Sequence, residues 1–151
     1  MGNRRKKKLF TIEEANRALP LVSAIASDYV KLHHDVVDRS DRLGEIAARQ
    51  DNGKSDVYSD EVEVAVRKLK KDSLRLDELV AEFQQLGVRP RGYDGVVEFP
   101  AELFGRNVVL SWRLGEPEVR YWRDPETEGG KRVPLDTAQA AEQGYGGTLG
   151  A

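Results

Sequence analysis

The chain contains no cysteine among its 151 residues. This absence excludes disulfides, thiolate nucleophiles and cysteine-ligated metal sites. Aromatic residues make up only 7% of the chain and hydrophobic residues 39%, whereas charged residues reach 33%. This composition favours an elongated helical structure with much solvated surface over a compact globule with a deep core. The length is typical of a single domain.

Long hydrophobic runs are also missing. The longest uncharged stretch near the start, Ala18 to Ser27, is too short to span a membrane, contains Pro20 and follows Glu13 and Glu14. We therefore expect a cytoplasmic protein without a membrane partner.

The net charge of −2 conceals an uneven distribution of charge. Five basic residues stand together near the start, namely Arg4, Arg5, Lys6, Lys7 and Lys8, which leaves 19 basic against 26 acidic residues in the rest. Such an arm can contact nucleic acid or anionic lipid, but it is equally typical of a solubilising terminus. We predict a basic flexible tail over residues 1–9, and the acidic body argues against nucleic acid as a partner.

Two long helices are predicted in the first half of the chain. The first begins with a capping box, in which Thr11 caps free N–H groups and Glu14 reaches back, while Phe10 forms a hydrophobic staple. Seam residues then recur every three or four positions over five heptads: Ile12, Ala15, Leu19, Val22, Ala26, Tyr29, His33, Val36, Ser40, Leu43 and Ala47. A second seam follows a turn at 50–55: Val62, Val66, Leu69, Ser73, Leu76, Val80 and Phe83. The pattern predicts helices over about 11–50 and 57–87, paired as an antiparallel, coiled-coil-like hairpin. Pro20 is expected to kink or divide the first helix.

Polar residues interrupt these seams at His33 and Ser73. With a turn centred near 52–54 the two residues lie roughly opposite each other, and a hydrogen bond between them would fix the register of the hairpin. The alternative is a metal site made by His33 and His34 with Asp35 or Asp38. Adjacent helical residues point to different faces, so these histidines cannot easily share one ion. We therefore predict the structural role and no metal.

The hydrophobic period changes from that of a helix to that of a strand after Pro90. Three strands are predicted, at about 95–99, 107–113 and 118–123, and three consecutive strands most simply form an antiparallel meander. The predicted fold is therefore α+β, a long helical hairpin followed by a small three-stranded antiparallel sheet, in one domain over 10–135. The glycine-rich residues 136–151 are predicted to be a flexible tail.

The last predicted hairpin offers the best candidate for a functional surface. If Arg113 faces Glu118, one side of the sheet is a core face that carries Val108, Leu110, Trp112, Val119 and Tyr121. The other side carries Ser111, Arg113, Glu118, Arg120 and Trp122. There the arginines could bind an anion and Trp122 could stack on a planar ligand or anchor a protein interface. Glu116 lies at the rim, and Glu98 could add a carboxylate. The alternative is ordinary cross-strand pairing, with Trp122 packed over aliphatic stems.

Three stretches carry a family resemblance. They are Phe10–Asn16 with Leu19–Val22, then Gly95–Ala101, then Trp112–Val119 with Tyr121 and Trp122. Together they resemble an uncharacterised prokaryotic family, domain of unknown function 2203, from about Phe10 to Leu135. The resemblance implies a bacterial protein but no activity, because the family has none that could be carried over. Its pattern has Cys where this chain has Ser111 and His where it has Arg123, so any metal or thiol chemistry of relatives at those positions is not expected here.

Three hypotheses for function remain. We favour a non-enzymatic interaction or structural protein that self-associates through the hairpin, with the sheet face or the C-terminal tail docking a partner. The alternative is a small-ligand-binding protein or enzyme that uses Arg113, Glu118, Arg120 and Trp122. Nucleic-acid binding through the basic arm is the weakest. No glycine-rich phosphate loop or nucleophile motif occurs, so catalytic residues are unknown, and we predict no cofactor.

Overall fold

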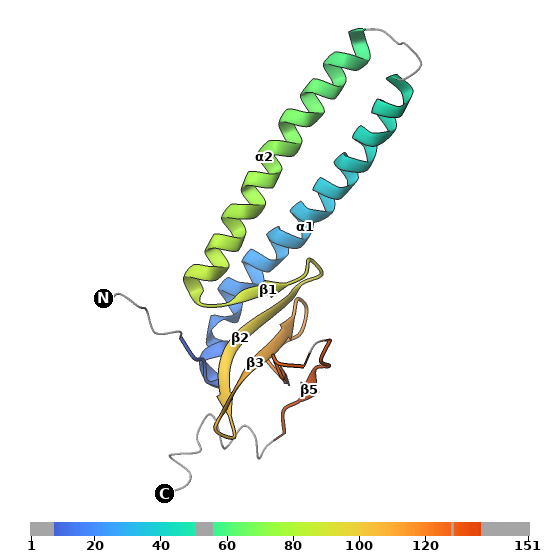
Figure 1. Ribbon diagram of the computed structural model, residues 1–151. Coiled ribbons are helices and arrows are strands. Elements are labelled where there is room, and N and C mark those ends of the chain that lie inside the picture. Colours follow the sequence, from blue (N-terminus) through green and yellow to red (C-terminus); the bar gives the residue numbers. More distant parts are fainter. Residues whose placement is uncertain (1–7, 51–55, 128, 137–151) are drawn as a thin grey trace, which may run out of the picture.

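The computed structural model describes residues 8–50, 56–127 and 129–136 of the chain. Two long helices, α1 (Ile12–Gln50) and α2 (Asp56–Leu86), form a hairpin, and five strands follow them. Figure 1 shows the sheet lying across the lower half of this hairpin, whose tip projects away from the sheet. The predicted α+β class is therefore confirmed.

Some predictions concern residues outside this description. The tails at 1–9 and 136–151 and the turn at 50–55 lie almost entirely there. Among the described residues, neither helix has a stretch that is both long and apolar enough to cross a membrane.

Helix α1 begins as predicted and then runs without interruption for 39 residues. The backbone N–H of Glu14 donates to Thr11 Oγ1 at 3.0 Å, and the N–H of Thr11 donates to Glu14 Oε1 at 2.9 Å, which confirms the capping box. Of the two outcomes expected at Pro20, a kink or a division of the helix, the division does not occur, because α1 continues through it. Pro20 lies on the exposed side of the helix. There water can satisfy the carbonyl group that the missing N–H leaves free.

The seam of α1 does not follow the predicted heptads to the end. Seam residues are buried from Ala15 to Tyr29, but Ser40 and Ala47 are exposed, and Ile46 is buried instead. A straight α-helix has 3.6 residues per turn, so a strict heptad drifts by about 20° per repeat around its surface. The buried stripe therefore has the period of a straight α-helix packed against another, and a coiled coil is not confirmed.

The register of the hairpin differs from the prediction by more than one helical turn. Arg39 of α1 forms an ion pair with Asp72 of α2, and the rings of Tyr29 and Phe83 meet edge to face at 5.7 Å between centroids. Ser73 is exposed and His33 stacks on the ring of Tyr93 at 3.8 Å, so the predicted hydrogen bond between His33 and Ser73 is wrong. The prediction therefore placed the α2 partner of each α1 residue about four or five positions too early in the chain.

The sheet contains five strands, where the sequence predicts three. They are β1 (Arg89–Arg91), β2 (Val96–Leu103), β3 (Arg106–Arg113), β4 (Tyr121–Arg123) and β5 (Val133–Pro134), and they form an antiparallel meander in that order. The prediction misses β1 and β5 because they are only three and two residues long and each contains a proline.

Strand β2 continues past Pro100, where the prediction ends it. The Pro100 carbonyl accepts a hydrogen bond from the Phe10 N–H at 2.7 Å, so this residue presents its backbone groups away from β3. The missing N–H of Pro100 therefore costs no bond within the β2–β3 ladder. Strands β2 and β3 close in a turn at Phe104 and Gly105, which have φ of 55° and 75°.

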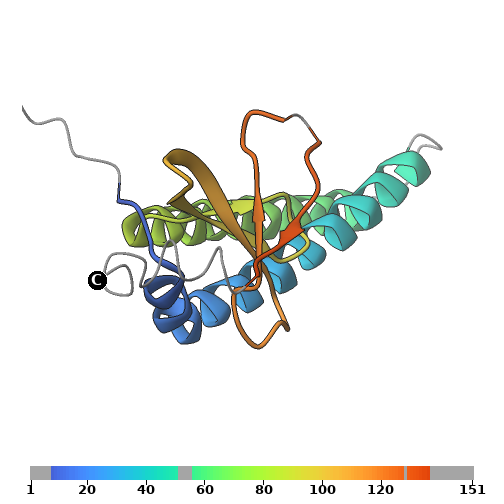
Figure 2. The same ribbon diagram turned by 90° about the horizontal axis from the view of Figure 1, so that it is seen from below.

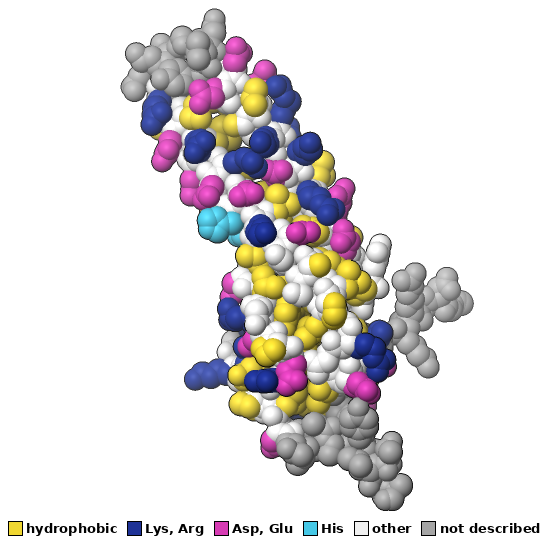
Figure 3. Space-filling view, turned by 180° about the vertical axis from the view of Figure 1, so that it is seen from behind, with side chains coloured by type: hydrophobic (Ala, Val, Ile, Leu, Met, Phe, Trp, Pro, Cys, Tyr) yellow, Lys and Arg dark blue, Asp and Glu magenta, His cyan; other side chains and the backbone are white. Residues whose placement is uncertain are grey.

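The hydrophobic core lies between one side of the sheet and the lower half of the hairpin. We call this side the core face; it carries Val97, Phe99, Leu110 and Trp112, all at most 1% exposed. They belong to one cluster with the first turns of α1 and the last turns of α2. The view from below in Figure 2 shows both helices beneath the sheet. Figure 3 shows hydrophobic side chains gathered over this half of the molecule, and charged side chains over the outer half of the hairpin.

Candidate functional site

The register of β3 with β4 decides which residues share a face of the sheet. The structure pairs Val109 with Arg123, Leu110 with Trp122 and Ser111 with Tyr121. The prediction paired Val109 with Trp122 and is wrong by one residue, because it assumed a short turn. The connection in fact runs from Leu114 to Arg120. A shift of one residue moves every side chain of β4 to the opposite face.

The predicted ligand surface is consequently divided between the two faces of the sheet. Trp122 packs against the hydrophobic core, and Arg106 lies over its ring at 5.5 Å from the ring centroid. Tyr121, which the prediction placed in the core, lies on the opposite side with Arg132 over its ring at 4.1 Å. We call this opposite side the outer face; its residues include Glu98, Ser111, Tyr121 and Arg123. An exposed tryptophan is therefore not available as a stacking surface among the charged residues.

The other predicted residues make ordinary surface contacts. Arg113 lies 3.4 Å from Asp94, and Arg120 lies 3.0 Å from Glu118, in pairs whose side chains are all about half exposed or more. Exposed pairs of this kind contribute roughly 0–1 kcal/mol each. Glu118 and Arg120 line a cavity of about 420 Å³ beside Asn16 and Leu135, whereas Glu98 lines a different one. The structure therefore does not assemble the predicted residues into one site.

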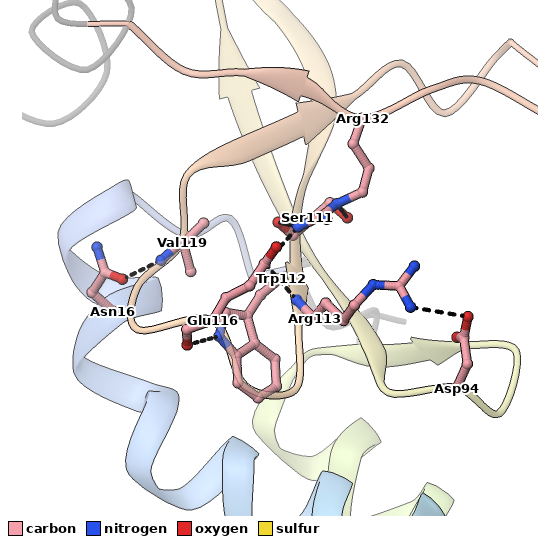
Figure 4. A network of polar contacts seen from close by, with 8 residues as sticks. All are labelled: Asn16, Asp94, Ser111, Trp112, Arg113, Glu116, Val119 and Arg132. Atoms are coloured by element: carbon pink, nitrogen blue, oxygen red, sulfur yellow. Dashed lines mark hydrogen bonds and ion pairs between the residues drawn. The ribbon is translucent and has the colours of Figure 1, made fainter.

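Glu116 has a structural role that the sequence does not reveal. Its Oε1 accepts hydrogen bonds from the Arg113 backbone N–H at 2.8 Å and from Arg132 at 2.6 Å, and its carbonyl accepts one from Trp112 Nε1 at 2.9 Å. The turn is also tied to α1, because the Val119 N–H donates to Asn16 Oδ1 at 2.7 Å. Figure 4 shows these contacts converging on the turn.

These contacts lower the pKa of Glu116, and they make the free energy of unfolding depend on pH. Burial opposes ionisation, but the hydrogen bonds from Arg132 and from the Arg113 backbone outweigh it and hold the pKa below the ordinary value of 4.5. A carboxyl group with a lowered folded-state pKa stabilises the fold above its unfolded-state pKa, and this contribution is lost as pH falls through the folded-state value. We expect the difference in unfolding free energy between wild type and Glu116→Gln to be large at pH 7 and to shrink below pH about 4.5.

Urea denaturation of both proteins between pH 7 and pH 3 measures this difference. Glu118→Gln is the matched control, since it removes an exposed carboxylate of the same turn whose ion pair within the described residues is with Arg120. A difference for Glu116→Gln that stays constant over the whole pH range would contradict the prediction.

Glu98 is the centre of the remaining charged cluster. It lies in β2 on the outer face, and it is 1% exposed although its neighbours in the strand are apolar. Arg123 of β4 donates through Nε to Glu98 Oε2 at 2.8 Å, and its own side chain is only 7% exposed. Two arginines of β1 approach the same carboxylate less closely, Arg89 at 3.6 Å and Arg91 at 3.7 Å. Two strands, β1 and β4, thus direct three guanidinium groups toward one buried carboxylate on β2.

A cavity of about 470 Å³ adjoins this cluster. Glu98 and Arg89 form part of its wall, and Gln84 and Asn107 add two amides. The rest of the wall is mainly apolar and comes from Leu9, Gly87, Val88, Pro100, Ala101, Val108, Val109 and Pro125. Volumes of this size, with mostly apolar walls and a few polar groups, are typical of small-molecule sites. The arrangement can hold an apolar group beside an arginine.

Sequence reasoning included Glu98 but missed its partners. Two signals could have found them. A glutamate inside the apolar run from Val96 to Phe99 needs a charged partner if the strand is buried. Arg89 and Arg91 are two positions apart, so in an extended chain both point to the same face. Arg123 falls opposite Val109 only in the register that the structure gives.

The histidines do not contribute to this site. Both lie on α1, where His33 stacks on Tyr93 and the exposed His34 lies 3.4 Å from Asp38. No group of three or more potential metal ligands occurs among the residues that the structure describes. The Ser111 hydroxyl, which lies on the outer face, accepts a hydrogen bond from Arg132 Nε at 3.0 Å.

Comparison with known proteins gives a family. A search of curated proteins and a search of solved structures each found no match to the chain. A family profile described as an uncharacterized conserved protein matches residues 8–135, which include the hairpin, the whole sheet and every residue of the Glu98 cluster. Two of the stretches that carry the resemblance also meet in space, through the bond between Asn16 and Val119. The chain therefore belongs to the family of domain of unknown function 2203.

Proposed function

We propose that this protein binds a small anionic ligand with an apolar body in the cavity beside Glu98. One observation carries the proposal: Arg89, Arg91 and Arg123 surround a single buried carboxylate. These four side chains hold three positive charges and one negative charge, an excess of two positive charges. Arg89 and Glu98 of this cluster line a cavity whose remaining wall is mainly apolar, and Arg91 and Arg123 lie beside them. An anionic head group would balance this charge, and an apolar body would fill the remaining space.

Arg89 is the residue best suited to contact the ligand. It lines the cavity, and its side chain is 68% exposed. Its Nε lies 3.6 Å from Glu98, which is longer than a hydrogen bond, so its donors are open to an incoming carboxylate or phosphate group. Arg123 is already engaged, because its Nε donates to Glu98 and its terminal nitrogen donates to the Asp124 carbonyl at 3.2 Å. Arg123 therefore fixes the position of Glu98, and Arg89 is available for the ligand.

Binding accounts for this geometry better than catalysis does. The Glu98 carboxylate is 1% exposed and already accepts a hydrogen bond from Arg123, so it is not free to take a proton from a substrate. Ser111 has no imidazole beside it, since the only two histidines of the chain lie on α1. An apolar wall and a guanidinium group give affinity and orientation, and they supply no nucleophile.

Isothermal titration calorimetry with octanoate tests the proposal. Octanoate should bind, whereas 1-octanol lacks the charge and inorganic phosphate lacks the apolar body, so each should bind more weakly. Arg89→Gln should weaken octanoate binding by about tenfold or more, since a hydrogen bond to a charged group contributes roughly 1.5–3 kcal/mol.

Arg67→Gln is the matched control. Arg67 is 66% exposed and lies 3.6 Å from Glu63, values close to those of Arg89, but it lies on α2 away from the cavity. It should leave octanoate binding unchanged. Octanoate that fails to bind at millimolar concentration, or that binds wild type and Arg89→Gln equally well, would contradict the proposal.

A further inference from the structure

A third cavity lies far from the sheet, between the two helices near the tip of the hairpin. Its volume is about 490 Å³, and its apolar floor consists of Leu43 and Ile46 of α1 with Val64 and Ala65 of α2. We call this cavity the tip groove. Val64 is 54% exposed at its edge. Figure 1 shows that the sheet lies at the other end of the hairpin and leaves this region uncovered.

Charged side chains of opposite sign border the tip groove at its two ends. Asp60 and Glu61 stand at the end nearest the loop between the helices, and Arg42 and Lys68 stand on the side toward the sheet. None of these four side chains forms an ion pair within the part of the chain that the structure describes. Along α2 the sequence of the groove is therefore acidic, apolar and basic.

Two copies of this surface are complementary to each other when their α2 helices run antiparallel, because the acidic end of one then faces the basic end of the other. Glu61 and Lys68 are seven residues apart, about 10 Å along the helix axis, and Val64 and Ala65 lie midway between them. A two-fold axis through this midpoint would run α2 antiparallel to α2 of a second copy. Glu61 of each copy would then face Lys68 of the other, and the exposed Val64 of each would enter the other's groove. Closed two-fold interfaces require this kind of self-complementary surface.

We infer that the tip groove is the interface of a homodimer of this chain, built around Val64 with reciprocal Glu61–Lys68 pairs. The inference is independent of ligand binding, because the two Glu98 cavities would lie toward the outer ends of the dimer. The apolar floor involves only four residues, which is small for a permanent interface. We therefore expect a reversible dimer with a dissociation constant of about micromolar order.

Sedimentation equilibrium of the full chain, over a range of concentrations, measures this association. Wild type should shift from the monomer mass toward twice that mass as concentration rises. Glu61→Lys and Lys68→Glu should each weaken the dimer by about tenfold or more, since each places like charges opposite one another. The double variant with both changes restores opposite charges and should recover most of the affinity. Recovery of this kind identifies the reciprocal pair, which a general loss of stability could not produce.

Two further variants keep the interpretation unambiguous. Glu63→Lys reverses an exposed charge on the same helix, where Glu63 pairs within the chain with Arg67, and it should leave the dimer intact. Val64→Arg should abolish the dimer, and far-UV circular dichroism should show that its helices persist. A wild-type chain that stays monomeric up to millimolar concentration would overturn the inference. Dimerisation that survives Val64→Arg, or a charge swap that fails to restore the affinity, would also overturn it.

Discussion

Replacement of Glu98 by alanine is expected to lower the free energy of unfolding by about 3–5 kcal/mol. The change removes the carboxylate that Arg123 contacts at 2.8 Å, and Arg123 is 7% exposed, so its guanidinium would remain in the interior without a counter-charge. Arg89 and Arg91 are 68% and 41% exposed and can turn toward water. The cost therefore comes mainly from Arg123. A loss of this size is a large fraction of the 5–15 kcal/mol that stabilises a typical domain.

Three further variants separate the lost charge from the lost volume. Glu98→Gln keeps the size of the side chain and one acceptor, so it should cost less than Glu98→Ala. The double variant Glu98→Leu with Arg123→Leu removes both buried charges and should recover much of the loss, as apolar replacement of a buried ion pair often does. Glu118→Ala, at an exposed ion pair, should change stability by no more than about 0.5 kcal/mol.

Guanidinium chloride denaturation followed by tryptophan fluorescence is the appropriate measurement. Both tryptophans lie in the sheet, Trp112 in β3 and Trp122 in β4, so the signal reports on the region that is altered. If Glu98→Ala cost less than about 1 kcal/mol, Arg123 would have to reach water without disturbing the sheet, and the account of a buried pair would fail.

The helices could be predicted from the sequence because their signals are local and repeated many times. The pattern of apolar positions extends over 39 and 31 residues, and the capping box at Thr11 and Glu14 marks the first end within one residue. Gly87 marks the other end, with φ of 85° after the last turn of α2. Alignment between the helices depends on the loop at 51–55, for which the sequence offers no periodic signal. The predicted pairing of His33 with Ser73 was therefore wrong.

The sheet shows the same division between local and non-local information. The alternating residues of β3 identify it as a strand, but the register of β4 depends on how many residues the connection uses. Within this connection Glu116 accepts hydrogen bonds from the Arg113 N–H and from Arg132, which hold the connection to β3 and to the segment before β5. Nothing in the spacing of the chain indicates that contact. The resulting shift of one residue brings Arg123 beside Glu98 and moves Trp122 into the core.

The candidate site could be predicted only in part for a related reason. Glu98 attracts attention by itself, because a charge inside an apolar strand needs an explanation. Its partners come from β1 and β4, on either side of the β2–β3 pair, and reach it only once the sheet has formed. The charged face that the sequence predicts and the cluster that the structure forms share Glu98 alone. Sites assembled across strands require the register as well as the residue types.

Replacement of Trp112 by alanine is the second change with a large expected effect, a loss of about 3–5 kcal/mol. Trp112 is 1% exposed and is among the largest fully buried side chains of the core. Its Nε1 also donates to the Glu116 carbonyl at 2.9 Å, which joins the core to the turn that sets the register of β4. Trp112→Phe keeps most of the apolar contact but loses this bond, so it should cost about 1–2 kcal/mol.

Leu74→Ala, at a side chain 65% exposed, is the matched control and should change stability by less than about 0.5 kcal/mol. Denaturation followed by Trp122 fluorescence measures all three variants. If Trp112→Phe proved as costly as Trp112→Ala, the hydrogen bond to the turn, and with it the register of β4, would matter more than the volume that the indole fills.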